Sequence, residues 1–473
     1  MDVDIAVLGG GPGGYTAAIR AAQLGARVAC IDRAPELGGT CLRIGCIPTN
    51  AWAQTALALK QAEETFGKLG VKLGGSHLDF PAANEWKTAV VKRMTGGVAF
   101  LFKANGVTWV KGTGTFTDAH TLAVDGGEDV TFASAVIATG SFPLRPPIEG
   151  LESGRCVDSE GLLAQTEVPR RLVILGGGVI GCEFASIFAR FGSQVTIIEM
   201  LPALIPQEDA DASNELAKQF RMRGIALHLG KQCTKVEDSG SELTVHFGDG
   251  ETVMADVMLV STGRGPLVEG LGLEEAGVEF DRRAGIAADP RRRTTVPHIY
   301  AVGDCAGYWQ LAHTAFREGE AAAQNACGHQ AVVGNRAVPP PDLHRTGDRQ
   351  RRRHRKASAP AVRRRRHDGS VSVGRERACR DAKRTRRLGQ VDPRDPRRRA
   401  ARPGNGRTAR DRHGGSGVIA IDAGATIETI ADGMAAHPTL SEAIKGAGLV
   451  ALGRAIDVPN RKPTRGISGR AAT

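Results

Sequence analysis

The sequence predicts an α/β fold that contains two separate strand–turn–helix–strand units. A glycine-rich turn follows a short apolar run at residues 3–8 and again at residues 171–175. A helical stretch and a second apolar run come after each turn, and an acidic residue closes each second run, Asp32 in the first unit and Glu199 in the second. The 61 Gly among 473 residues fit a fold of this kind, which is rich in tight turns.

Composition excludes several classes of protein. A chain of 473 residues is long enough for about three domains. No uncharged apolar run approaches the ~20 residues that span a bilayer, so we expect no membrane segment. The first residues, Met1 to Asp4, are acidic and lack the basic start of a signal peptide, which leads us to expect a cytoplasmic protein. The nine Cys are scattered except for Cys41 and Cys46, so we expect no disulfide framework, and these two could form a dedicated redox or metal pair. The other cysteines show no metal-ligand spacing, and we expect no metal site.

The net charge of +11 comes from one segment of the chain. Residues 345–412 hold 24 Arg and 2 Lys against 7 acidic residues, which is a net charge of +19. The remaining 405 residues therefore carry a net charge of −8. Most of the chain is acidic, and the overall basic balance is a poor argument for binding to nucleic acid.

The two glycine-rich turns have the spacing of dinucleotide-binding sites. In both units the first glycine precedes the closing acid by 23 positions. The first glycine makes the tight turn, the second lets backbone approach a pyrophosphate, the third allows close packing of helix on strand, and the acid takes a ribose. These residues are Gly9, Gly11, Gly14 and Asp32 in the first unit and Gly176, Gly178, Gly181 and Glu199 in the second. Two copies in this context predict two Rossmann-like dinucleotide-binding domains.

The stretch after Glu199, MLPALIPQEDA, contains no Arg or Lys that could hold a 2′-phosphate. We therefore expect the second domain to prefer NAD over NADP.

Cys41 and Cys46 lie in the run GGTCLRIGCIP, directly after the first unit. Positions five apart on an ideal helix have Cα atoms roughly 8.7 Å apart, which exceeds the ~7 Å limit for a disulfide. A bridge therefore needs a distorted turn, which Gly45 and Pro48 would permit. On the residues alone, the two cysteines are either core thiols or a labile, catalytic redox pair.

Several ordered motifs resemble the flavin-linked disulfide reductases, and specifically the dihydrolipoamide dehydrogenase family. They are GGTCLRIGCIP, both glycine motifs, Ala138-Thr139-Gly140, Thr262-Gly263-Arg264, Val302-Gly303-Asp304 and the run HPTLSE from His437 to Glu442. The resemblance runs from residue 1 to about 340 and resumes near 418. It implies an FAD-binding domain at 1–145 and 275–335, an NAD-binding domain at 146–274, and a C-terminal α+β dimerisation domain that is largely disrupted. Of that last domain, 336–417 would be an anomalous Arg-rich segment and 418–473 a remnant.

The resemblance also implies roles for individual residues. Cys41 would be the interchange thiol that meets the substrate, and Cys46 the thiol against the flavin. His437 would be the general base, oriented by Glu442, in the reaction of dihydrolipoamide and NAD⁺ to lipoamide and NADH. The absence of any Cys after Cys379 favours a lipoamide substrate over those of related reductases with an extra C-terminal Cys pair.

The implied cofactor residues fall into two sets. FAD would be held by the first glycine motif and by Asp32, Thr40, Gly114, Ala138, Thr139, Gly140, Ser141, Asp304, Leu311, Ala312 and His313. NAD would be held by the second motif and by Glu183, Glu199, Val236 and Gly263. Asn50 stands near the flavin where the family has a Lys that pairs with the glutamate at 183. If Glu183 is buried, we expect slower flavin reduction, and faster reduction in Asn50→Lys.

The Arg-rich stretch departs most from the family. Its only residues from the set VILMFWY are Val362, Val371, Val373, Leu388 and Val391, too few for a core. It could be a disordered nucleic-acid-binding insert, a solvated linker or a frame-shifted stretch of coding DNA. Codons for PDLHRTGDRQRR at 341–352, read one nucleotide later, can give PIYTEPEIASV, and 403–414 can give LGMVGPHATDM. Both strings resemble the family's dimerisation domain, so compensating frameshifts are the favoured interpretation.

The resemblance implies partners as well. These are the lipoyl domains of 2-oxoacid dehydrogenase or glycine-cleavage complexes, a homodimer with an active site shared between subunits, and a part in cell redox homeostasis. If 341–413 is as written, the interface sheet is missing, dimerisation is in doubt and His437 would fail to reach the cysteines. The alternatives are then another NAD(P)H-dependent disulfide reductase or an NADH diaphorase, with an Arg-rich nucleic-acid-binding protein as a remote third.

Overall fold

A computed structural model describes residues 1–307, 309–333, 420, 424–439 and 442–460. The chain forms two compact units. The first contains residues 1–348, 434–439 and 454–473, and the second contains 349–433 and 440–453. The Arg-rich stretch at 345–412 lies outside the described residues.

The first sheet of the larger unit is built around parallel strands that are buried on both faces. β1 pairs in parallel with β2 and with β6, and β19 joins the far edge of β6 in the same direction. Seven consecutive residues, DVDIAVL, form β1, and most of them are buried, as expected for a central strand between helical layers. The strand order in this sheet is β3-β2-β1-β6-β5-β4, and β19 pairs with β6. In that order, with β19 last, the strands are Thr108–Lys111, Val28–Asp32, Asp2–Leu8, Val130–Ile137, Thr121–Val124, Gly114–Asp118 and Ile299–Ala301.

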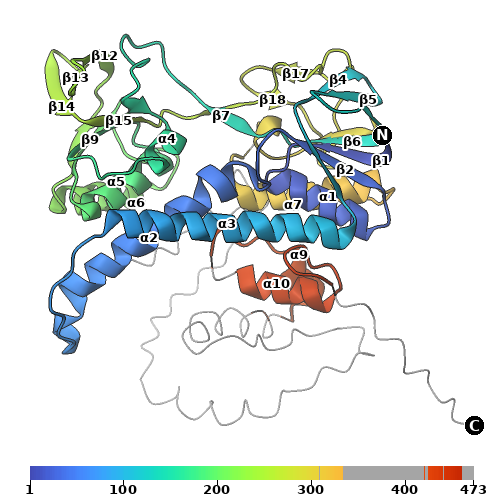
Figure 1. The fold of residues 1–473 in the computed structure, drawn as a ribbon, viewed down its shortest axis with the longest axis horizontal. Helices are drawn as coiled ribbons and strands as arrows, with labels where there is room; N and C mark the ends of the chain where they lie inside the picture. The colour runs from blue at the N-terminus through green and yellow to red at the C-terminus, as the bar shows by residue number, and fades with distance from the viewer. Residues whose placement is uncertain (308, 334–419, 421–423, 440–441, 461–473) are drawn as a thin grey trace, which may run out of the picture. The chain divides into compact units, whose positions relative to one another are not determined.

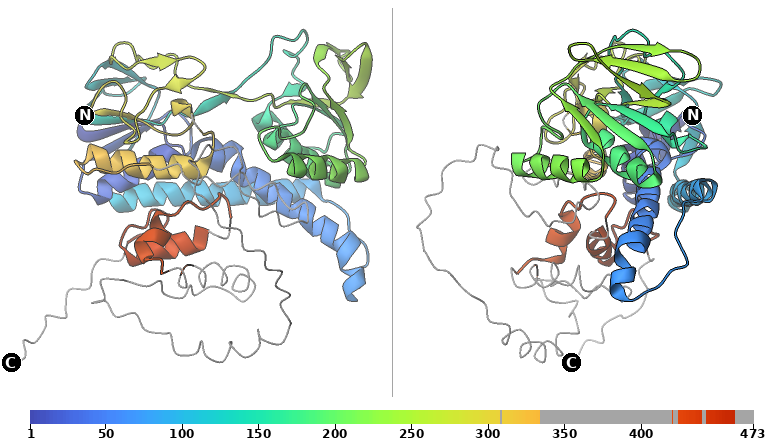
Figure 2. Two further views of the ribbon diagram at one scale, coloured as in Figure 1. Left: turned by 180° about the vertical axis from the view of Figure 1, so that it is seen from behind. Right: turned by 90° about the vertical axis from the view of Figure 1, so that its left-hand side faces the viewer.

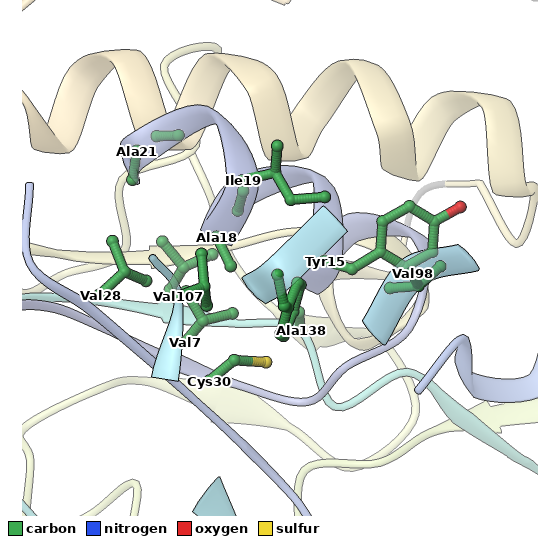
Figure 3. Packing of buried hydrophobic residues seen from close by; sticks show 14 of the residues in the cluster. Val7, Tyr15, Ala18, Ile19, Ala21, Val28, Cys30, Val98, Val107 and Ala138 are labelled. Carbon is green, nitrogen blue, oxygen red and sulfur yellow. The ribbon is translucent and has the colours of Figure 1, made fainter. Parts of the chain in front are cut away.

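Three helices lie against this sheet (Figure 1). They are α1 (Pro12–Gln23), α3 (Phe80–Asn105) and α7 (Ala312–Ala326). Small residues on α1 let it approach both the sheet and α7, and Ala17, Ala18 and Ala21 are all fully buried. Figure 3 shows this core, where Val7 and Val28 of the sheet lie beneath Ala18 and Ile19 of α1.

The second sheet is entirely parallel, in the order β11-β10-β9-β15-β8. A three-stranded antiparallel sheet, β12-β13-β14, accompanies it. The strands β8 to β15 are Cys156–Val157, Arg171–Leu175, Gln194–Glu199, Ala226–Leu229, Cys233–Asp238, Leu243–Phe247, Glu251–Ala255 and Val257–Val260. The helices are α4 (Ser159–Leu163), α5 (Val179–Phe191) and α6 (Ala210–Met222).

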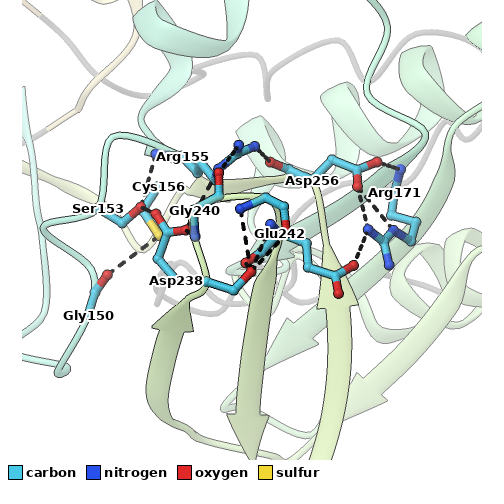
Figure 4. Close-up of polar contacts among 11 residues, drawn as sticks. Gly150, Ser153, Arg155, Cys156, Arg171, Asp238, Gly240, Glu242 and Asp256 are labelled. Atoms are coloured by element: carbon cyan, nitrogen blue, oxygen red, sulfur yellow. Dashed lines mark hydrogen bonds and ion pairs between the residues drawn. The ribbon is translucent and has the colours of Figure 1, made fainter.

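Polar contacts tie the antiparallel sheet to the parallel one (Figure 4). Arg171 at the start of β9 forms ion pairs with Asp256, 2.5 Å, and Glu242, 2.8 Å. Arg155 donates to the carbonyl oxygens of Asp256 and Gly240, at 3.2 and 2.8 Å. The two guanidinium groups therefore link the turn between β12 and β13 to Asp256, which lies between β14 and β15.

Helices α2 (Cys46–Lys60) and α3 contribute to the cores of both sheets. Trp52 of α2 is fully buried and packs edge-on against Phe188 of α5, with ring centroids 5.7 Å apart. Phe80 at the start of α3 joins the same cluster, whereas Val98 and Phe102 near its end belong to the core of the first sheet. Both helices thus connect the two halves of the larger unit (Figure 2).

The remaining elements are short. They are the turns Thr40–Ile44, Gln61–Thr65, Gly67–Leu69 and Gly303–Ala306, and the paired strands β7 (Ser141–Pro143) with β16 (Arg264–Pro266) and β17 (Phe280–Asp281) with β18 (Gly285–Ile286). The smaller unit contains α9 (Ile427–Asp432) and α10 (Glu442–Ala451), and Gly448 of α10 packs closely on the backbone of Ala431.

Within the described ranges, every helix is too short or too polar to serve as a transmembrane span.

The prediction of two parallel-sheet units of the strand–turn–helix–strand type is confirmed. Each half of the larger unit carries one such sheet. The domain boundaries proposed from the sequence, 1–145 with 275–335 and 146–274, remain a proposal.

Candidate active site

The two glycine turns have nearly the same geometry. Gly9 and Gly176 have φ angles of +104° and +109°, in the region that favours glycine. A Cβ on Gly14 would lie 1.8 Å from the carbonyl oxygen of Gly9, and one on Gly181 would lie 2.1 Å from that of Gly176. The first and third glycines of each motif are therefore needed by the fold itself.

Each acidic residue predicted to bind a ribose also accepts hydrogen bonds from backbone amides, one of them in the glycine turn of its own unit. The carboxylate of Asp32 accepts from the amides of Gly10, 2.5 Å, and Ala34, 2.7 Å. The carboxylate of Glu199 does the same with Gly177, 2.5 Å, and Leu201, 2.7 Å. Both acids thus order the turn beside which a ribose would lie.

The helix starts separate into two groups. Asp79, Asp158 and Asp209 cap α3, α4 and α6 with side-chain hydrogen bonds. In contrast, α1, α5 and α7 begin after Gly11, Gly178 and Leu311, have no side-chain cap and carry no acid in their first turn. Their amides and positive dipole ends are therefore available to an anion. These are the helices at which the sequence predicts the two dinucleotides, so the residues present fit phosphate-bearing cofactors.

The Cys pair lies on a distorted turn, as its spacing requires. Thr40–Ile44 is a π-helical turn, Gly45 breaks it with φ −146° and ψ −112°, and α2 begins at Cys46. Cys41 is buried and Cys46 is half-buried. The two thiols hydrogen-bond to each other.

Cys46 has an acidic thiol. The hydrogen bond from Cys41 is the largest cause that lowers its pKa from 9.0 to about 7. Burial opposes this shift, the positive charge of His437 adds to it, and the negative charge of Asp304 opposes it. About half of Cys46 is therefore thiolate near neutral pH, the form that exchanges with disulfides.

Asp304, predicted to bind FAD, is part of a buried hydrogen-bonded chain. Ser141 Oγ donates to its carboxylate at 2.5 Å, and Arg264 Nε donates to Ser141 Oγ at 2.8 Å. Burial raises the pKa of Asp304, while the Ser141 hydrogen bond and the charge of Arg264 lower it. This chain joins β7 and β16 to the turn at 303–306.

The sequence did not predict the buried ion pair that supports the turn at 303–306. Glu318 of α7 accepts from the amide of Gly303 at 2.8 Å and faces Arg292 at 3.5 Å. Both side chains are less than 5% exposed, and Arg292 also donates to the carbonyl of Ala301 at 3.1 Å. The signal in the sequence was weak, because Glu318 is one of two acids on the Ala-rich helix at 312–326 and nothing local distinguishes it from Glu320.

His437 lies in the larger unit, and its positive charge lowers the pKa of Cys46. Its ring packs edge-on against that of Phe316 on α7, with centroids 5.1 Å apart. Glu442 begins α10 in the smaller unit, so its predicted role in orienting His437 stays a prediction. Phe316 was not predicted as a site residue.

The other predicted cofactor residues occupy varied surroundings. Thr139 Oγ1 donates to the Leu267 carbonyl at 2.7 Å, and Gly140 has φ +79°. Val236 has its side chain buried in the core of the antiparallel sheet, so only its backbone could reach a ligand. Half-buried positions are Thr40, Asn50, Glu183, Leu311 and Ala312, and buried ones are Gly114, Ala138 and His313. Gly263 is exposed, with φ +124°.

Glu183 is therefore half-buried, and the condition set for the Asn50 hypothesis is met only in part. Asn50 accepts from Gln54 Nε2 at 3.4 Å, one turn along α2.

Comparison with known proteins agrees with this geometry. The pyridine nucleotide-disulphide oxidoreductase family model matches residues 3–319. A dihydrolipoyl dehydrogenase of Bacillus subtilis is 40% identical over 341 residues, which cover 71% of this chain and 74% of that protein. The mitochondrial dihydrolipoyl dehydrogenase of Schizosaccharomyces pombe is 33% identical over 472 residues, which cover 95% and 90%.

A solved structure leads to the same family. The HOCl-induced flavoprotein disulfide reductase RclA from Escherichia coli superposes with a TM-score of 0.62 at 31% identity, over 68% of this chain and 70% of that one. The chain therefore belongs to the pyridine nucleotide-disulphide oxidoreductase family, as an NAD-dependent flavoprotein disulfide oxidoreductase that uses FAD and NAD(H).

Proposed function

We propose that the chain catalyses the reversible oxidation of dihydrolipoamide by NAD⁺. The observation that carries this proposal is the group formed by Cys41, Cys46 and His437: two hydrogen-bonded thiols, one of them acidic, and an imidazole whose positive charge lowers the pKa of that thiol. A dithiol substrate needs both a disulfide that it can reduce and a base that takes its proton. Relatives named dihydrolipoyl dehydrogenase support this choice of substrate.

The exchange steps balance on these three residues. His437 takes the proton from one substrate thiol, and the resulting thiolate attacks Sγ of Cys41, which breaks the Cys41–Cys46 disulfide and leaves Cys46 as thiolate. The second substrate thiol then displaces Cys41 and passes its proton to the departing Cys41 sulfur, which closes the lipoamide disulfide and leaves Cys41 as a thiol. The acidic thiol of Cys46 makes it a good leaving group, because a thiolate of low pKa leaves faster.

The cofactors would occupy the two glycine turns. FAD would be held by the first glycine turn, the uncapped starts of α1 and α7, and the Ser141–Asp304 pair. NAD would be held by the second glycine turn, Glu199 and the start of α5. When bound, FAD supplies a two-electron carrier between the Cys pair and the nicotinamide.

Steady-state kinetics test this proposal. We expect NAD⁺ reduction with dihydrolipoamide, and loss of that activity in Cys41→Ser and Cys46→Ser, while Cys156→Ser, a buried thiol of β8, stays active. Equal or better turnover with another disulfide would instead favour the second candidate, a different NAD-linked disulfide reductase, which the similarity to the Escherichia coli enzyme supports. Turnover only with small electron acceptors would make the protein a diaphorase.

Several further expectations belong to this proposal. They are a cytoplasmic location, a role in cell redox homeostasis, lipoyl domains of 2-oxoacid dehydrogenase or glycine-cleavage complexes as partners, and the family's homodimer. Analytical ultracentrifugation tests the homodimer.

A further inference from the structure

We propose that Lys87 of α3 is a modification site whose side-chain amine accepts an acyl group from a thioester. Lys87 lines a cavity of about 540 Å³ between α3 and the end of α4. This amine takes part in no step of the proposed redox reaction, so the site stands whether or not the chain oxidises dihydrolipoamide. The transfer moves an acyl group from sulfur to nitrogen and needs no oxidant or reductant.

The first observation is the surroundings of the amine. Lys87 is only 9% exposed. Its Nζ donates to the carbonyl oxygen of Leu163, the last residue of α4, and lies 4.3 Å from the ring centroid of Trp52. A carbonyl oxygen and an aromatic ring stabilise an ammonium group less than a carboxylate does. Burial therefore lowers the pKa of this amine from 10.5 to about 8, and none of the described carboxylates opposes that shift.

The lowered pKa makes Lys87 a nucleophile near neutral pH, because only the neutral amine attacks a carbonyl carbon. With a pKa of about 8, roughly a tenth of the Lys87 side chains are neutral at pH 7. A lysine in water, with a pKa of about 10.4, is neutral in less than about one molecule in a thousand at that pH. The neutral fraction of Lys87 rises as the pH increases and is nearly complete above pH 9.

The second observation is the cavity beside this amine. Its exposed lining residues are Glu85, Thr88, Ala89, Lys92 and Ala164. A reagent can therefore reach the cavity from solvent. Asn84 also lines it, one turn before Lys87, and donates from Nδ2 to the carbonyl of Gln165 at 2.8 Å. Its Oδ1 is buried and has no hydrogen-bond partner among the described residues. An occupant with an amide N–H would satisfy this acceptor, and the arms of coenzyme A and of lipoamide both carry such a group.

The transfer balances on these groups. The neutral amine attacks the carbonyl carbon of the thioester, a C–N bond forms, the C–S bond breaks, and the thiolate leaves with the proton that the nitrogen loses. Thr88 and Lys92 line the same cavity and are donors suited to the carbonyl oxygen, which becomes negative during the attack.

The product also suits the contacts of the amine. The amide keeps one N–H for the carbonyl of Leu163, and it has no charge to bury. Addition of carbon dioxide would instead create a carboxylate, an anion that the carbonyl oxygen and the negative face of the Trp52 ring repel. The site therefore favours an acyl donor over carbon dioxide.

Peptide mass spectrometry of the full-length wild-type protein tests the site. The protein is incubated with acetyl-CoA in one arm and with S-acetyldihydrolipoamide in the other, over a range of pH. We expect Lys87 to be acetylated at pH 7 about tenfold faster than Lys92, the exposed lysine of the same cavity. The rate at Lys87 is expected to level off above about pH 8. A high rate in either arm supports the proposal, and the faster arm identifies the carrier. Acetylation of Lys87 no faster than that of Lys92 in both arms overturns it.

Filling the cavity gives a second test. Ala89→Trp places a large ring in the lining from an exposed position of α3. The matched control is Ala104→Trp, an exposed alanine of the same helix outside the lining. We expect Ala89→Trp to slow acetylation of Lys87 about fivefold, because the ring clashes with the donor, and Ala104→Trp to leave the rate unchanged, with circular dichroism unchanged in both. An unchanged rate in Ala89→Trp means that the donor does not use this cavity, and it overturns the proposal.

Discussion

Single residues decide the redox chemistry of this protein. Cys46 differs from the other buried cysteines because its thiol hydrogen-bonds to a second thiol, that of Cys41. Burial raises the pKa of Cys156 to about 11 and of Cys182 to about 12, whereas the Cys41 hydrogen bond outweighs burial at Cys46 and lowers its pKa to about 7. The contrast makes Cys46 the reactive thiol at neutral pH.

The first prediction follows from that contrast. The thiolate fraction of Cys46 rises as the pH passes about 7, so its alkylation rate rises there too. Cys41→Ala removes the largest stabilising contact and is expected to move the midpoint toward 9. Cys182 in the same samples is expected to stay unmodified below pH 10. Mass spectrometry of the alkylated peptides measures both, and an unchanged midpoint in Cys41→Ala would contradict the role given to the hydrogen bond.

The buried pair of Arg292 and Glu318 supports a second prediction. Removing one partner of a buried ion pair leaves the other charge uncompensated, which costs about 3–5 kcal/mol. We therefore expect Glu318→Ala to lower the free energy of unfolding by that amount, as measured by chemical denaturation. Glu242→Ala, which breaks a more exposed pair with Arg171, serves as the control with a loss of about 1 kcal/mol or less. Equal losses in the two variants would argue against the pair as a buried support.

At the scale of the elements, the same strand–turn–helix motif occurs twice in the chain. A parallel strand, a turn that starts with a left-handed glycine, and an uncapped helix occur at residues 2–23 and at 171–191. In each copy an acid from the next strand orders the turn. The repeat explains how one chain presents two separate sites for anionic dinucleotides.

In the second glycine motif we expect Gly181 to matter for folding and Gly178 to matter for NADH binding, which gives a third prediction. A Cβ on Gly181 would lie 2.1 Å from the Gly176 carbonyl oxygen, so Gly181→Ala forces the helix away from the strand and is expected to cost about 1–3 kcal/mol. A Cβ on Gly178 meets no atom within 4 Å, and its φ of −71° suits alanine. Gly178→Ala is therefore expected to fold normally but to bind NADH about tenfold more weakly, equivalent to about 1.4 kcal/mol. Fluorescence titration with NADH and thermal unfolding measure the two effects. Unchanged NADH affinity in Gly178→Ala would place the pyrophosphate elsewhere.

At the scale of the whole molecule, the unusual part of the sequence is the Arg-rich stretch in the C-terminal third. Residues 345–412 bring a net charge of +19 and five large apolar residues, a composition that cannot bury a core. The larger unit nevertheless assembles from residues before and after this stretch, since 434–439 and 454–460 pack on the first 333 residues.

The frameshift interpretation makes the fourth prediction. Resequencing codons 335–420, with the intact mass of the expressed protein as a check, is expected to restore a reading frame that encodes a string like PIYTEPEIASV in place of PDLHRTGDRQRR. The basic charge of the chain would then disappear with the Arg-rich stretch. DNA that encodes the stretch as written would contradict this prediction.

Local sequence was sufficient to predict much of this protein. The two glycine turns, their acids and the need for a distorted turn between Cys41 and Cys46 were all predictable, because each depends on residues within about 25 positions of one another and on backbone geometry that few residue types allow. Other features were decided only by the tertiary structure. Ser141 meets Asp304 across 163 positions of sequence, and Phe316 meets His437 across 121. Such contacts depend on which elements pack together, and a single acid or aromatic residue in a helix carries no periodic signal of its distant partner.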